Sequence, residues 1–180
     1  TEAGRGVYSF CMCPGGYVVN ASSEKNMLAV NGMSYSGRNS GNANSAIIVT
    51  VTPDDYGNNG ALAGMYYQRE LEKLAYRYGD GNEDFRQDRI STGFGIVTPN
   101  IKGSYSFANL RNVLGTTISD SISEGVKGFA KHIKGFDMED AVFSGVESRT
   151  SSPVRIIRNE NCESDIKGLF PCGEGAGYAG

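Results

Sequence analysis

Apolar side chains follow their clearest helical spacing between residues 61 and 78. Four of them are separated by four, three and four positions, which places them on one face of an α-helix. They are Tyr67, Leu71, Leu74 and Tyr78. Gly79 follows directly, and glycine commonly ends a helix because it adopts the left-handed conformation without strain. We therefore expect a helix over residues 61–78 with this stripe packed in the core.

A second helical pattern lies between residues 117 and 133. Thr117 and Asp120 are three residues apart, as in a capping box that begins a helix. The apolar stripe of this helix consists of Ile118, Ile122, Val126, Phe129 and Ile133. Such spacing predicts one buried face. His132, the only histidine in the chain, adjoins that stripe and is expected to be a partly exposed helix residue.

Two shorter helical segments are expected on either side of this helix. Ser106 can cap the first of them, which runs to Val113. The side chains expected to face inward there are Phe107, Leu110 and Leu114. Residues 138–143 are expected to form a helical turn or an entry into the last part of the chain.

β-branched and aromatic residues predict short strands in the first fifty residues. Residues 7–10 and 17–21 flank Pro14-Gly15-Gly16, a strong turn signal, so they are expected to form a hairpin. Residues 27–30 predict a strand followed by a turn at Asn31-Gly32.

Residues 45–52 contain the longest run of β-branched and apolar residues, which predicts a strand buried on both faces that ends at Pro53. A polar, glycine-rich loop is expected at residues 34–44. Later strands are expected at residues 146–149, 154–157 and 169–170. Together with the helices, these strands predict an α+β fold.

Composition narrows the class of protein. The 180 residues are 39% hydrophobic and 21% charged, which is typical of a globular domain with a core. The net charge of −3 argues against a nucleic-acid partner. No apolar run reaches the roughly 20 residues that span a membrane, and the N-terminal residues do not form a signal peptide. We expect a cytoplasmic protein without a membrane partner.

The last residues form a glycine-rich segment after a short apolar run. Gly173, Gly175 and Gly177 would let the backbone approach a ligand closely, and Glu174 between them can accept hydrogen bonds from hydroxyl groups. A helix that begins there would direct free N–H groups at a ligand. The alternative interpretation is an ordinary glycine-rich loop.

Several long motifs resemble those of a known family. The C-terminal pair comprises Gly145-Val146-Glu147-Ser148-Arg149-Thr150-Ser151-Ser152-Pro153-Val154-Arg155-Ile156 and Gly168-Leu169-Phe170-Pro171-Cys172-Gly173-Glu174-Gly175-Ala176-Gly177-Tyr178-Ala179-Gly180. The others are Tyr8-Ser9-Phe10-Cys11-Met12-Cys13-Pro14-Gly15-Gly16, Asn31-Gly32-Met33-Ser34 and Asn42-Ala43-Asn44-Ser45-Ala46. In order and spacing, they resemble a family of uncharacterised bacterial FAD-dependent dehydrogenases over essentially the whole chain.

This resemblance implies a flavoprotein with a Rossmann-like FAD-binding domain and an inserted substrate domain. Residues 1–143 would be a β-rich, partial substrate domain with helices, and residues 144–180 the incomplete return into the FAD-binding domain. Glu174 would contact the ribityl chain of FAD, and the backbone at Gly175–Gly177 would face the isoalloxazine. The cofactor-binding residues implied are Gly173, Glu174, Gly175, Ala176 and Gly177. The resemblance also implies an extended segment at residues 85–90.

A dinucleotide-binding fold needs a Gly-x-Gly-x-x-Gly sequence between its first strand and helix. No such sequence precedes residue 173. We therefore expect that motif upstream in a longer protein, and we expect this chain alone to be inactive and to bind FAD weakly or not at all. Its partners would be a small-molecule substrate and the remainder of its own polypeptide. The alternative hypothesis is a stand-alone α+β binding or interaction domain without catalytic activity.

The candidate catalytic residues are Cys11, Cys13 and Arg149. Either cysteine could be a redox-active thiol near the flavin, although buried thiols that act as small apolar residues are the simpler expectation. The spacing of these two with Cys162 and Cys172 does not favour zinc, and one histidine excludes a His-pair site, so no metal is expected. Arg149, beside Thr150, Ser151 and Ser152, could hold an anionic substrate group or form a structural ion pair.

Overall fold

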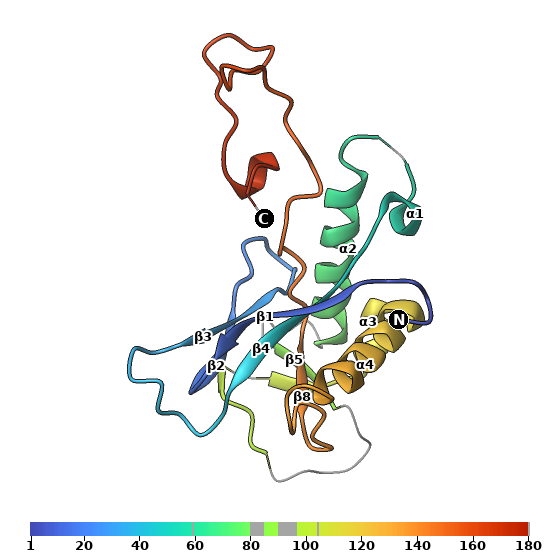
Figure 1. Ribbon diagram of the computed structural model, residues 1–180, viewed down its shortest axis with the longest axis vertical. Helices are drawn as coiled ribbons and strands as arrows, with labels where there is room; N and C mark the ends of the chain where they lie inside the picture. Colours follow the sequence, from blue (N-terminus) through green and yellow to red (C-terminus); the bar gives the residue numbers. More distant parts are fainter. Residues whose placement is uncertain (59, 80–84, 90–96, 104, 180) are drawn as a thin grey trace. The chain divides into compact units, whose positions relative to one another are not determined.

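The computed structural model describes residues 1–58, 60–79, 85–89, 97–103 and 105–179. Runs of strands are followed by runs of helices along the chain, so the predicted α+β class is confirmed (Figure 1). The chain divides into two compact units. The first contains Thr1–Thr50 and Leu71–Glu147, and the second contains Val51–Glu70 and Ser148–Gly180.

Three small sheets are present among the described residues of the first unit. In the first sheet, β1 (Val7–Cys13) pairs antiparallel with β4 (Asn44–Val49). In the second, β2 (Gly16–Asn20) lies between β3 (Val30–Ser34) and β6 (Ile101–Lys102). In the third, β5 (Phe85–Arg89) lies between β7 (Tyr105–Phe107) and β8 (Val142–Gly145). The strand expected at residues 85–90 is therefore confirmed as far as Arg89.

The hairpin expected from the first two strands is wrong, although both strands and the turn at Pro14-Gly15 are present. β1 has an irregular register between Phe10 and Cys13, and Cys11 has a φ of 51°. Such a bulge bends the strand. β1 therefore pairs with β4, and β2 forms its antiparallel pair with β3 instead.

Two other strand predictions need correction. The strand expected at residues 27–30 begins only at Val30 and includes Asn31-Gly32, which was expected to be a turn. β4 ends at Val49 and is half-buried at every position instead of being buried on both faces. Pro53 does not terminate this strand but begins the short helix α1 (Pro53–Tyr56), which Thr52 and Asp55 cap reciprocally.

The long helix α2 (Ala63–Tyr78) confirms the strongest helical prediction. Its expected stripe is only partly correct, because Tyr78 is exposed while Glu72 on the same helix is completely buried. Helix α4 (Thr116–Ala130) confirms the second prediction, and His132 lies exposed just beyond its end.

Both capping predictions near α4 are wrong. Ser106 lies in β7, and the short helix α3 (Arg111–Leu114) begins later than expected, so Phe107 is exposed. Thr117 lies inside α4, whose N-cap position is Gly115. Asp120 instead forms an ion pair with Arg111. The apolar pattern thus identified the helices but not their first residues.

The core of the first unit joins segments that are distant in sequence. Its buried cluster comprises Leu28, Ala75, Val113 and Val146, with Leu71 and Leu74 packed against it. The backbone N–H of Leu28 donates to the carbonyl of Glu72 at 3.0 Å, and that of Val30 donates to the carbonyl of Val146 at 2.9 Å. The first bond ties the segment before β3 to α2, and the second ties the first residue of β3 to the residue that follows β8.

Most of the second unit lacks regular structure, and Figure 1 draws residues 148–173 without a helix or strand. The strands expected at residues 146–149, 154–157 and 169–170 are irregular, and β8 ends before the first of them. Leu169 and Phe170 are exposed, not buried. A strand needs a partner for its backbone N–H and C=O groups. Within the described residues, these segments form isolated backbone bonds but pair with no strand, so the closing strand of a Rossmann-like sheet is not confirmed.

Glu147 gives the first unit a pH-dependent contribution to stability. This carboxyl is half-buried beside buried Val146, and burial raises its pKa above the ordinary value of 4.5. A raised pKa in the folded state means that the stabilising contribution is fully present below pH 4.5 and is lost as pH rises through the folded pKa. We expect Glu147→Gln to gain free energy of unfolding, relative to the natural chain, between pH 4 and pH 7.

Urea denaturation at several pH values measures this difference. Glu160→Gln is the control, because it removes one carboxylate from an exposed position of the chain. A difference between Glu147→Gln and the natural chain that does not change with pH would contradict the assignment.

Candidate functional site

The glycine-rich segment forms one tight turn. Its 3₁₀ helix η1 (Glu174–Ala176) is a single turn. The N–H of Gly177 donates to the carbonyl of Glu174 at 2.8 Å, and the N–H of Tyr178 donates to that of Gly173 at 3.0 Å. Glu174 is exposed on this turn. The backbone is therefore fixed by its own hydrogen bonds while the carboxylate remains accessible.

Residues 152–156 hold this turn in place. The N–H of Ile156 donates to the carbonyl of Ala176 at 3.1 Å, and the hydroxyl of Tyr178 donates to the carbonyl of Ile156 at 2.8 Å. The Ser152 hydroxyl lies 3.2 Å from the carbonyl oxygen of Gly175. The two C-terminal motifs of the sequence are thus in direct contact.

Gly177 makes this contact possible. Its φ is +81°, in the left-handed region that favours glycine. A Cβ at this position would lie 2.7 Å from the carbonyl oxygen of Val154 and 2.9 Å from the Cα of Arg155. Both are backbone atoms, so a larger residue would push the two segments apart.

Helix α2 anchors the other end of the same segment. The side-chain amide of Gln68 donates to the carbonyl of Ser148 at 2.9 Å and to that of Ser151 at 3.2 Å. The rings of Tyr56 and Tyr67 pack 5.7 Å apart between α1 and α2. The segment that leads to Arg155 is therefore attached to regular structure of its own unit.

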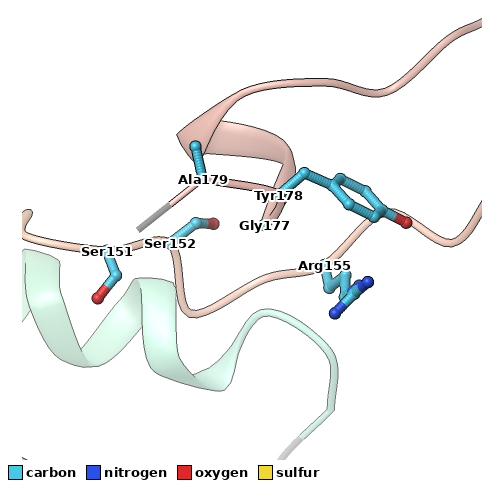
Figure 2. Close-up of a pocket in the computed structure, with 6 residues that line it drawn as sticks. All are labelled: Ser151, Ser152, Arg155, Gly177, Tyr178 and Ala179. Atoms are coloured by element: carbon cyan, nitrogen blue, oxygen red, sulfur yellow. The ribbon is translucent and has the colours of Figure 1, made fainter.

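A cavity of about 390 Å³ lies between the two motifs, as Figure 2 shows. Its walls are formed by Ser151, Ser152, Arg155, Gly177, Tyr178 and Ala179. The guanidinium of Arg155 lies over the ring of Tyr178, 4.5 Å from its centroid. The guanidinium of Arg158 lies 3.6 Å from the same centroid. The cavity therefore has a cationic and aromatic side and a side of small polar residues.

The predicted catalytic residues are not gathered at this cavity. Arg149 is exposed and is not one of the lining residues. Cys11 is exposed, so the expectation that both thiols of this pair are buried is wrong. Cys13 is half-buried, and its thiol donates to the carbonyl of Cys11 at 3.2 Å. Both cysteines lie in the first unit.

Sequence reasoning missed the pairing of Arg155 with Tyr178. Each residue lies in one of the two C-terminal motifs, but their separation of more than twenty positions conveys no contact. The strand expected at residues 154–157 gave no reason to single out Arg155. The sequence offered one indication of this contact, which is that the two motifs contain several charged and aromatic residues.

The described part of the chain contains neither a metal centre nor a membrane-spanning helix. No three or more His, Cys, Asp or Glu side chains lie there in an arrangement that could hold a metal ion. None of the helices described combines the length and the apolar character needed to cross a membrane.

Comparison with known proteins finds a matching family and a similar protein. The family model described as FAD-dependent protein, C-terminal domain-like, matches residues 1–150. An uncharacterized protein of Clostridium beijerinckii is 49% identical over 185 residues, which cover 98% of this chain and 35% of that protein. This chain thus spans about a third of the length of that relative.

Proposed function

This chain belongs to the family described as FAD-dependent protein, C-terminal domain-like, and we propose that it is part of an FAD-dependent oxidoreductase, a dehydrogenase that acts on a small molecule. The family match over residues 1–150 is the observation that carries the proposal. The flavin would supply the redox chemistry when bound, and the protein would bind and orient the substrate.

We propose that residues 173–177 contact the flavin. The turn is held by hydrogen bonds at 2.8 and 3.0 Å, and Glu174 is exposed upon it. A carboxylate can accept hydrogen bonds from the ribityl hydroxyls, and charge-assisted bonds of this kind are the stronger ones. The small residues around it leave the backbone open to close approach by a planar ring.

The division into a partial substrate domain at residues 1–143 and a return into the FAD-binding domain at residues 144–180 is part of the same proposal. Exposed apolar side chains between residues 156 and 170 support it. Ile157 is 69% exposed, Ile166 67% and Phe170 57%. Several large apolar side chains left exposed in one short segment are consistent with an interaction surface. Its occupant here would be the remainder of the same polypeptide.

Arg149, Cys11 and Cys13 remain proposed catalytic residues in this account. Arg149 is the second residue of the second unit's C-terminal segment, and its exposure leaves it accessible to a ligand. Exposure likewise leaves the Cys11 thiol accessible to a redox partner. We propose a cytoplasmic location, where thiols are kept reduced.

Replacement of Glu174 tests the proposed flavin contact. In the longer protein that contains this chain, we expect Glu174→Ala to weaken FAD binding about tenfold or more, because hydrogen bonds to a charged group contribute roughly 1.5–3 kcal/mol. Titration followed by flavin absorbance measures the dissociation constant.

Glu160→Ala is the matched control, since it removes one exposed carboxylate from the same unit outside the turn. We expect this control to bind FAD as the natural protein does. Equal FAD affinity in the Glu174→Ala protein and in the control would count against the proposed contact.

A further inference from the structure

We propose that the cavity formed by Ser151, Ser152, Arg155, Gly177, Tyr178 and Ala179 binds an oxyanion group, a carboxylate or a phosphate, through the guanidinium of Arg155. Arg155 is the only charged residue among these six lining residues. The volume of about 390 Å³ exceeds what a bare ion requires, so the oxyanion would belong to a small organic molecule.

The donors of Arg155 are available for such a ligand. Within the part of the chain that the structure describes, its guanidinium contacts only the ring of Tyr178, with the guanidinium carbon 4.5 Å from the ring centroid. A guanidinium that lies over a ring keeps its in-plane N–H groups free. Those groups match the two oxygens of a carboxylate or phosphate in a bidentate arrangement.

Tyr178 fixes the position of Arg155 before a ligand arrives. The hydroxyl of Tyr178 donates to the carbonyl of Ile156 at 2.8 Å. Arg158 lies 3.6 Å from the centre of the same ring, and its guanidinium donates to the carbonyl of Pro171 at 2.5 Å. A binding group that is already positioned loses less conformational freedom when the ligand binds.

Two serines also line the cavity, Ser151 and Ser152. The carbonyl of Ser151 accepts a hydrogen bond from Gln68 at 3.2 Å, which fixes the backbone, and its exposed hydroxyl has no recorded partner among the described residues. The Ser152 hydroxyl differs, since it already lies 2.8 Å from the carbonyl oxygen of Val154. Arg155 is therefore the side chain that we propose an oxyanion contacts.

The position of Gly177 limits the molecules to which the oxyanion could belong. This residue lines the cavity and also belongs to the turn proposed to contact FAD. The oxyanion would then belong to the substrate or to the pyrophosphate of FAD. This identification rests on the proposed function, whereas the binding of an oxyanion by Arg155 does not.

Calorimetric titration of the longer protein with inorganic phosphate and with acetate tests the proposal. We expect saturable binding of at least one of these probes, weakened about tenfold or more in Arg155→Ala. Lys167→Ala removes one positive charge from an exposed position of the same unit and should leave the affinity unchanged. Arg155→Lys keeps the charge without the bidentate geometry and should restore only part of the affinity.

Absence of saturable binding by the natural protein, or equal affinity in the natural and Arg155→Ala proteins, would overturn the proposal. Equal loss of affinity in Lys167→Ala and Arg155→Ala would do the same, because it would show a general charge effect. Circular dichroism of each variant ensures that the comparison is made between folded proteins.

FAD titration of the same variants distinguishes the two sources. A parallel loss of FAD affinity in Arg155→Ala, with phosphate competing against FAD, identifies the flavin pyrophosphate. Unchanged FAD affinity, together with lost binding of the probe, identifies a separate molecule such as the substrate. A protein that binds no FAD but still binds phosphate through Arg155 would refute the proposed function and leave the oxyanion site standing.

Discussion

Replacing Gly177 with alanine should weaken FAD binding to the longer protein about thirtyfold or more. The left-handed backbone at φ +81° disfavours a residue with a Cβ by about 1–2 kcal/mol. That Cβ would also lie 2.7 Å from the carbonyl oxygen of Val154, and overpacking of this kind costs about 1–3 kcal/mol. In our proposal the turn keeps this conformation when it contacts FAD. The sum of the two costs, at least ~2 kcal/mol, then corresponds to the thirtyfold loss of FAD affinity.

Gly168→Ala separates backbone strain from the close approach. Gly168 has a similar φ of +83°, but a Cβ there would have no atom within 4 Å. We expect this control to lose some stability and to retain FAD affinity, as measured by flavin absorbance and by thermal melting. The importance of the contact between the two motifs would be refuted if Gly177→Ala bound FAD as tightly as Gly168→Ala.

Leu28→Ala should lower the free energy of unfolding of the first unit by about 2–5 kcal/mol. Leu28 is completely buried and packs in the cluster with Ala75, Val113 and Val146. The deletion removes apolar contacts and leaves a space that surrounding residues fill only in part. Since small domains are stable by about 5–15 kcal/mol, this change removes a large fraction of the total.

Urea denaturation followed by far-UV circular dichroism measures the loss. Leu62→Ala is the control, because Leu62 is 43% exposed and its truncation should change stability by no more than about 0.5 kcal/mol. A similar effect of both substitutions would show that the segment before β3 does not belong to the core.

The helices were the most predictable part of the fold. A spacing of three and four residues is local, so it identified α2 and α4 directly from the sequence. Their first residues were harder to predict, because Ser106 and Thr117 have side chains that suit a cap but backbones that other contacts place elsewhere. Asp120 shows the reason most clearly, since its carboxylate pairs with Arg111 of the preceding helix.

Strand pairing was less predictable, because it depends on residues far apart in the chain. The turn at Pro14-Gly15 suggested that β1 and β2 are partners, yet the irregular register before Cys13 directs β1 to β4. Residues 154–157 were expected to form a strand, but a strand also needs a partner. There the backbone bonds to the glycine-rich turn instead, as the 3.1 Å bond from Ile156 to Ala176 shows.

The candidate site was predictable in part. The sequence identified residues 173–177 and the segment around Ser151 and Ser152. In the structure residues 173–177 form the turn, and Ser151, Ser152 and Gly177 line the cavity beside it. The sequence selected Arg149 as the cation for an anionic group, whereas Arg155 lines the cavity. The difference between them depends on which side of an irregular segment faces the turn, and no periodic pattern encodes that.

We propose that this chain contributes part of the flavin site of a longer FAD-dependent protein. Titration of FAD into the longer protein and into residues 1–180 alone, followed by absorbance and calorimetry, tests it most directly. The account predicts one tightly bound FAD and a yellow protein in the first case, and weak or no binding by a colourless chain in the second. Tight, stoichiometric binding by residues 1–180 alone, or no binding by the longer protein, would contradict it.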